Sequence, residues 1–226
     1  MAGRAVAEPR LSREVPSGRK KLGVGIVLML LEALRTHLLQ QLPEVTAHDD
    51  YDLDSAPPGF GAVKASVLLP VIQREEPMLL FTRRTETLAR HSGQVSFPGG
   101  RSEDGDLSPV ETALRETFEE TGIAPNFVTV AGYLDRYLTG TGFDIQPVVG
   151  VLADGFALVP DPREVAQIFE VPLAFLLDPA NRRRESREIA GRQRSFYAFT
   201  YKEHEIWGAT AAIVVNLAQR LGAIES

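Results

Sequence analysis

The sequence lacks cysteine altogether. Without thiols the chain can form no disulfide, use no thiolate nucleophile and hold no zinc or iron-sulfur centre through sulfur. This absence is typical of proteins from a reducing compartment, and we expect a cytoplasmic location.

Basic residues are too few for a nucleic-acid-binding surface. The chain has 24 Lys and Arg against 30 Asp and Glu, a net charge of -6 and a pI near 5.3. Binding to phosphate backbones depends on clustered cations, so this balance argues against a nucleic-acid partner. It leaves room for a local basic pocket that takes a small anion.

Long hydrophobic runs are also missing. The most apolar stretch, residues 22–39, is interrupted by Glu32 and Arg35. Its uncharged part is about ten residues, where a membrane span needs ~20. We therefore expect no membrane span and predict a helix with one apolar face at about residues 24–41.

The apolar content that is present, 44% of 226 residues, suffices for one core of good size. Residues 1–21 are polar and rich in Gly, Pro and Ser, which is typical of a flexible arm. Residues 43–61 mix acids with prolines and glycines and are typical of a linker. We predict an arm, helix and linker over residues 1–62 and one globular domain over residues 63–226.

Short runs rich in Val, Leu and Ile predict most of the strands of this domain. They cover residues 64–72, 78–84, 93–97, 126–138 and 144–152. A hairpin over residues 195–209, turning near Lys202–Glu203, precedes a closing helix at 210–224. Strands interleaved with few helices indicate a mixed sheet flanked by helices.

One further helix has clear end signals. Ser108-Pro109-Val110-Glu111 is a capping box with proline at the first helical position. Gly122 is placed to end the helix, with Pro125 just beyond it. These signals predict a helix over residues 109–121.

The acidic residues of this helix share one side. At about 100° per residue, Glu120 lies about 40° from Glu116 on one side and Glu119 about 60° on the other. Leu114 and Phe118 fall opposite, so we expect both in the core.

Like charges at this spacing repel one another and weaken a helix, so a cation is expected among them. Arg115 is four residues from both Glu111 and Glu119 and can pair with either. Three carboxylates without Cys or His suit Mg2+ or Mn2+. The alternative is an ordinary solvated acidic face, which does not account for the Gly-Gly pair upstream.

The segment "PGG...ALRETFEETGI" resembles the Nudix box of the Nudix hydrolases. The matching positions are Gly100, Arg115–Glu116, Glu119–Glu120 and Gly122–Ile123. The resemblance implies an α/β (α+β) fold, the Nudix-type α/β/α sandwich around a mixed β-sheet, here with an N-terminal helical extension. It also implies metal-dependent hydrolysis of a nucleoside diphosphate linked to another moiety.

Two positions depart from the family pattern. Asp106 stands where the family usually has Glu, and eight residues rather than seven separate it from Arg115, so we assign it no role. Thr117 replaces an aliphatic residue.

The one-residue insertion and the upstream residues 79–100 resemble the coenzyme A pyrophosphatases. The positions kept are Thr82, Arg84, Leu88, His91, Gly93, Gln94 and Phe97 to Gly100, while a usual arginine appears as Ala89 with Arg90 beside it. The implied substrate is coenzyme A or a derivative, cut to 3',5'-ADP and 4'-phosphopantetheine.

The resemblance assigns roles to individual residues. The catalytic residues it implies are Arg115, Glu116, Glu119 and Glu120; Mg2+ or Mn2+ would be held by the three glutamates and Gly100; the substrate would be bound by Arg84, Arg90, Gln94, Phe97 and Gly99. We expect Gly99–Gly100 to form a turn that lets phosphate or metal approach the backbone closely.

Several alternatives stay open. The general base is Asp161, Glu164 or a glutamate of the box. The substrate class has two alternatives, another nucleoside diphosphate derivative and, in a non-catalytic Nudix module, a ligand that is bound without cleavage. The oligomeric state is undetermined, a homodimer being one option.

Overall fold

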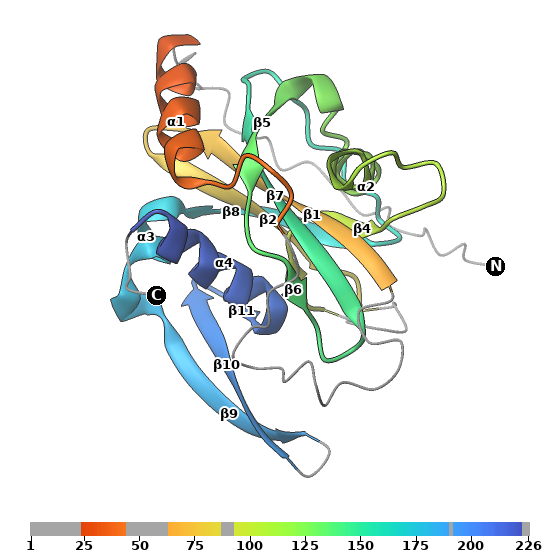
Figure 1. Ribbon diagram of the computed structural model, residues 1–226, viewed down its shortest axis with the longest axis vertical. Helices are drawn as coiled ribbons and strands as arrows, with labels where there is room; N and C mark the ends of the chain where they lie inside the picture. The colour runs from red at the N-terminus through yellow and green to blue at the C-terminus, as the bar shows by residue number, and fades with distance from the viewer. Residues whose placement is uncertain (1–23, 44–62, 87–92, 190–191, 223–226) are drawn as a thin grey trace, which may run out of the picture.

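The computed structural model describes residues 24–43, 63–86, 93–189 and 192–222. These residues form a mixed sheet with helices on both faces (Figure 1). The α-helices are α1 (Val24–His37), α2 (Pro109–Thr121), α3 (Leu173–Leu177) and α4 (Gly208–Arg220). The strands are β1 (Val63–Gln73), β2 (Pro77–Arg84), β3 (Val95–Ser96), β4 (Gly99–Arg101), β5 (Val128–Tyr133), β6 (Tyr137–Leu138), β7 (Phe143–Leu152), β8 (Val165–Pro172), β9 (Arg183–Ile189), β10 (Arg192–Tyr201) and β11 (His204–Trp207).

The main sheet has the strand order β3-β2-β1-β7-β5, with β4 paired to β1, β6 to β7 and β8 to β2. β1 and β7 are parallel, and the other pairs are antiparallel. β1 changes partner along its length: Val71 to Gln73 pair with β2, whereas Ala65 to Val67 pair with β4. Strand β4, which contains Gly99 and Gly100, therefore pairs with β1 beyond the part of β1 that pairs with β2.

The two faces of the sheet are covered by different helices. Leu68, on the face where Val148 also lies, packs toward α2. Leu69 and Phe81, on the other face, share a core with α1, α3 and α4. This arrangement confirms the predicted α/β/α sandwich around a mixed sheet.

The N-terminal helix is part of the same core. Leu31, Leu34 and Leu38 are buried, and Leu39 forms a bridge to Tyr133 at the free edge of β5. The helix predicted at residues 24–41 is confirmed, with its end at His37. The predicted arm, and the linker beyond residue 43, lie outside the described residues.

No helix among the described residues is long and apolar enough to cross a membrane.

The strand predictions were partly wrong. The hairpin turning at Lys202–Glu203 and the helix after it are confirmed. Residues 126–138 form two strands, β5 and β6, which pair with different parts of β7 and are separated by residues 134–136. β8 and β9 were not predicted. β9 joins β10 and β11 in a separate three-stranded sheet whose β9–β10 hairpin projects from the body (Figure 1).

Candidate active site

Helix α2 begins and ends at the predicted residues. Ser108 Oγ accepts a hydrogen bond from the Glu111 amide at 3.2 Å, and the Glu111 carboxylate accepts one from the Leu107 amide at 2.8 Å. Gly122 adopts a left-handed conformation (φ 76°) and its amide donates to the Phe118 carbonyl at 2.8 Å. Side-chain caps and a C-terminal glycine thus satisfy helix-end groups, as the local sequence predicts.

The buried face of α2 differs from the prediction. Phe118 is 52% exposed, so its expected place in the core was wrong, whereas Leu114 does pack against the core. Thr117 and Thr121 are fully buried instead, and each hydroxyl donates at 2.6 Å to the carbonyl four residues earlier. Because their hydroxyls are satisfied within the helix, threonines can face the sheet closely.

Glu120 lies on the same buried side of α2 as Thr117 and Thr121, and its carboxylate is in the interior. Glu120 is 4% exposed and accepts a hydrogen bond from the Gly99 amide at 3.3 Å, while Arg84 Nη1 lies 3.7 Å from its carboxylate. Burial raises the pKa of Glu120 to about 8, although Arg84 and Gly99 act in the opposite direction. Burial also raises the pKa of Glu116. Both carboxylates lie in an environment that disfavours uncompensated negative charge.

Gly99 and Gly100 form strand β4 rather than the predicted turn. Gly99 has φ 151°, and a Cβ there would overlap the Ser66 carbonyl of β1. A Cβ at Gly100 would overlap the carboxylate of Glu116. The absence of side chains is what lets the sheet backbone and the acidic face of α2 approach each other.

Arg115 is the cation that lies among the acids. Its guanidinium donates to Asp106 through Nε at 3.1 Å and Nη2 at 2.9 Å, to Glu116 at 3.1 Å and to Glu119 at 3.4 Å. Pairing with Glu119 is thus observed; the alternative partner, Glu111, is engaged in the helix cap.

Asp106, to which the sequence assigned no role, is central to this arrangement. Its side chain is 8% exposed and also accepts from Thr112 Oγ1 at 2.9 Å. The hydrogen bonds from Arg115 hold the pKa of the Asp106 carboxyl well below its usual range. The sequence did contain an indication of this role, because Asp106 stands where the Nudix pattern has a glutamate in the loop. Its shorter side chain and the altered spacing to Arg115 made the correspondence uncertain.

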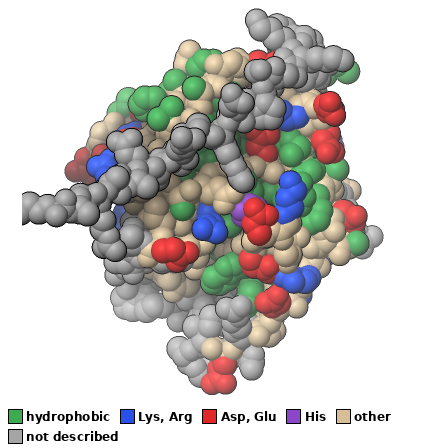
Figure 2. Space-filling view, turned by 180° about the vertical axis from the view of Figure 1, so that it is seen from behind, with side chains coloured by type: hydrophobic (Ala, Val, Ile, Leu, Met, Phe, Trp, Pro, Cys, Tyr) green, Lys and Arg blue, Asp and Glu red, His purple; other side chains and the backbone are tan. Residues whose placement is uncertain are grey.

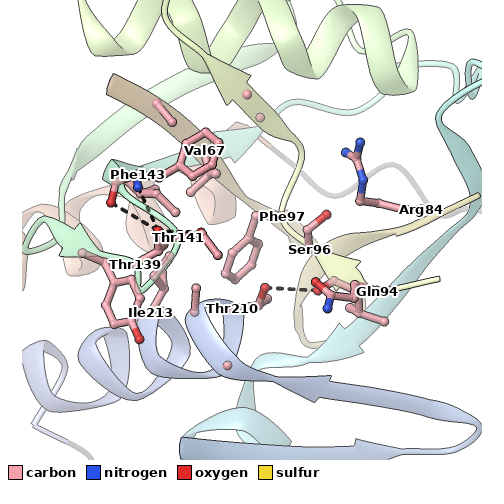
Figure 3. A pocket seen from close by; sticks show the side chains of 18 of the residues that line it. Val67, Arg84, Gln94, Ser96, Phe97, Thr139, Thr141, Phe143, Thr210 and Ile213 are labelled. Carbon is pink, nitrogen blue, oxygen red and sulfur yellow. Dashed lines mark hydrogen bonds between the residues drawn. The ribbon is translucent and has the colours of Figure 1, made fainter. Parts of the chain in front are cut away.

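A cavity of about 580 Å3 lies on the other side of β4, between the sheet and α4 (Figure 3). Five residues of the predicted site line it: Arg84, Gln94, Phe97, Gly99 and Gly100. Glu116, Glu119 and Glu120 stand on the α2 side. Arg90, together with Leu88 and His91 of the upstream motif, lies outside the described residues.

The sequence did not indicate several other residues that line the cavity. They are Tyr137, Phe143, Arg101 and Trp207, the last of which is half-buried at the cavity wall. They come from β4, β6, β7 and β11, so no local spacing in the sequence joins them.

The donor chemistry of the site fits a hard divalent cation. Glu120 is buried and Glu116 partly buried, both offer carboxylate oxygens, and the strand at Gly100 approaches them without a side chain. Within the described part of the chain, no three His, Asp or Glu side chains are already gathered as a metal cluster. Glu119 in particular has a side chain 56% exposed and is turned to Arg115.

Over the face seen from behind, acidic and basic side chains are interspersed rather than gathered by sign (Figure 2).

Comparisons with known proteins add the family context. A family model described as a NUDIX domain matches residues 63–205. The "Uncharacterized Nudix hydrolase NudL" of Photorhabdus laumondii is 43% identical over 157 residues, covering 70% of this chain and 84% of that protein. The protein of the same name from Yersinia enterocolitica is 40% identical over 157 residues, covering 70% and 80%. Among solved structures, a C. elegans Ap4A hydrolase complex has a TM-score of 0.43 at 16% identity, covering 49% of this chain and 80% of that one.

Proposed function

Because this chain belongs to the Nudix hydrolase family, whose members act on nucleoside diphosphate derivatives and generally use divalent metal ions, we propose that it hydrolyses the diphosphate bond of coenzyme A or one of its derivatives. The products would be 3',5'-ADP and 4'-phosphopantetheine, or its acyl form. We further propose that it acts in the cytoplasm, as the lack of cysteine suggests.

The observation that carries the proposal is the meeting of two chemically different walls at β4. On one side Glu116 and Glu120 approach Gly99–Gly100, and on the other the cavity opens. Arg84 lines the cavity, and its Nη1 also lies 3.7 Å from the Glu120 carboxylate, so it stands where the two sides meet. A diphosphate bound along β4 would have carboxylate oxygens for a metal and a guanidinium close to them. The cavity is of a size that takes the rest of a nucleotide derivative, since ligand pockets commonly measure about 300–1,000 Å3.

The upstream motif supports coenzyme A among the possible diphosphates. Of its described residues, Arg84, Gln94 and Phe97 line the cavity, and Thr82 is buried beside them, 3.2 Å from Ser96 Oγ. A motif that lines the substrate cavity is suited to choosing the substrate.

In the proposed reaction, Arg84 would bind the phosphates, and Arg115 would orient the carboxylates of Glu116 and Glu119. Mg2+ or Mn2+, held by Glu116, Glu119, Glu120 and the Gly100 carbonyl, would supply positive charge to offset that of the diphosphate. The buried setting strengthens each of these electrostatic contacts.

The general base is better assigned to Glu164 than to Asp161. Asp161 accepts from the backbone amide and the guanidinium of Arg163, at 2.6 Å for the closest contact. The charge of Glu164 contributes to the raised pKa values of Glu116 and Glu120, and its carbonyl accepts from the Thr85 amide at 2.9 Å, next to Arg84. Glu164 is thus a carboxylate close to the site that forms no ion pair with an arginine among the described residues, unlike Asp161.

The test is hydrolysis of coenzyme A, ADP-ribose, NADH and a nucleoside triphosphate, each with Mg2+, with Mn2+ and with EDTA. Metal-dependent release of 3',5'-ADP from coenzyme A in preference to cleavage of the others would support the proposal. Preference for another compound would support the proposed catalytic site but contradict coenzyme A as the substrate. Tight binding without cleavage of any compound would favour a ligand-binding module.

A further inference from the structure

Arg101 is a cation on the cavity side of the catalytic strand. Successive residues of a strand point to opposite faces, so while the Cα–H of Gly100 faces Glu116, the side chain of Arg101 leaves toward the cavity, which it lines. Its guanidinium carbon lies 5.2 Å from the centre of the Phe143 ring. Among the described residues, no carboxylate forms an ion pair with it.

The cavity therefore has two cations at separate places. Arg84 and Arg101 are the charged residues among those described at its wall, and no acid lines it. Figure 3 shows Arg84 on one side of the cavity and Phe143, with Thr139 and Thr141, on the other. Arg84 serves the diphosphate in the proposed reaction, which leaves Arg101 for a second anionic group.

We propose that Arg101 binds a phosphate monoester on the ribose of the substrate and so selects nucleotides that carry one. The inference rests on the proposed function and names the part of coenzyme A that the cavity recognises. In coenzyme A a single ribose separates this phosphate from the diphosphate, and Arg101 is likewise only one residue, about 3.3 Å of strand, from Gly100. Stacking on Phe143 would hold the guanidinium plane for a two-point contact with phosphate oxygens.

Coenzyme A and dephospho-coenzyme A, which differ by this phosphate, form a matched pair of substrates. We expect the wild type to have a higher kcat/KM for coenzyme A, and Arg101→Ala to lower the ratio of the two kcat/KM values roughly tenfold or more, since a charge-assisted contact is worth about 1.5–3 kcal/mol. Arg101→Lys should keep part of the ratio, because the charge remains. Arg182→Ala removes an arginine 5.4 Å from a Tyr197 ring but outside the cavity lining, and should leave the ratio unchanged.

A second measurement separates this inference from the proposed function. Calorimetric binding of 3',5'-ADP and 5'-AMP in EDTA needs no hydrolysis and no metal. Tighter binding of 3',5'-ADP by the wild type, lost in Arg101→Ala, would support the inference even if coenzyme A is not cleaved. Equal affinity of the wild type for both nucleotides, or an Arg101→Ala variant with an unchanged preference, would overturn it whether or not coenzyme A is a substrate.

Discussion

Asp106 and Arg115 form a two-point hydrogen bond, with Nε to Oδ1 at 3.1 Å and Nη2 to Oδ2 at 2.9 Å. This contact uses one edge of the guanidinium and leaves Nη1 directed at Glu116, 3.1 Å away, and at Glu119. A residue of the loop thereby sets the position of the cation that orients the carboxylates of α2.

Replacing Asp106 should weaken both the fold and the reaction. Asp106→Asn removes one charged acceptor from a partly buried pair, and we expect a loss of roughly 1–3 kcal/mol in the free energy of unfolding and a lower kcat. Urea denaturation and steady-state kinetics measure the two effects. The control is Glu103→Gln, since Glu103 is 3.9 Å from Arg115 with a side chain 69% exposed, and an equal loss in both variants would contradict the role of Asp106.

The stabilisation by Asp106 should depend on pH with a defined sign. Its pKa in the folded state lies below the ordinary value of 3.8, so the unfolded state binds the proton more readily. The contribution is complete above about pH 5 and is lost as the pH falls below the unfolded pKa. The difference in unfolding free energy between wild type and Asp106→Asn should therefore shrink from pH 6 to pH 3; a constant difference would speak against the ion pair.

Gly100→Ala should disable the site more than it disturbs the fold. The added methyl would overlap the Glu116 carboxylate and displace it, and a displacement of about 1 Å at a catalytic group can cost ~100-fold in rate. Gly105→Ala is the matched control, because a Cβ there meets no atom within 4 Å. If the two variants have the same kcat, the close approach of β4 to α2 is not required for hydrolysis.

Glu120→Gln should abolish metal-dependent hydrolysis while leaving the protein folded. Its carboxylate is desolvated, and burial already disfavours the charged form, with a pKa of about 8, so a neutral amide of the same shape should not lower the melting temperature at pH 7 in EDTA. Added Mg2+ should raise the melting temperature of the wild type and not that of the variant. Wild-type turnover by Glu120→Gln would remove this residue from the metal site.

Glu164→Gln should lower kcat at least tenfold with little change in KM, as expected for a group that acts on the attacking water. Asp161→Asn, the matched change three residues earlier in the same loop, should retain most of the activity because Asp161 is paired with Arg163. Equal effects of the two substitutions would contradict Glu164 as the general base and favour a glutamate of the Nudix box instead.

Local signals were sufficient for several elements. The ends of α2 follow from Ser108, Glu111 and Gly122, whose caps involve residues only a few positions apart. The hairpin at Lys202–Glu203 and the strand that begins at Val63 were likewise predictable, because apolar runs and turns lie next to each other in the chain.

Other features could not be read locally. The helical wheel sorts α2 into two faces but does not say which face meets the sheet. It therefore placed Phe118, which is exposed, in the core and did not predict that Thr117 is buried. The conformation of Gly99–Gly100 as a strand depends on pairing with β1, more than 30 residues away, which no local propensity reports.

The sequence by itself supplied the residues that resemble the Nudix box: carboxylates at helical spacing, glycines before them and an arginine beside them, in a chain without cysteine. Only the tertiary structure decided how these groups act on one another. It buried Glu120 against Gly99, joined Asp106 to Arg115 and gathered Arg84, Arg101 and Phe143 around one cavity. The physical reason is that burial, pairing and cavity shape arise from contacts between segments distant in the chain, whereas spacing in the sequence reports only on neighbours.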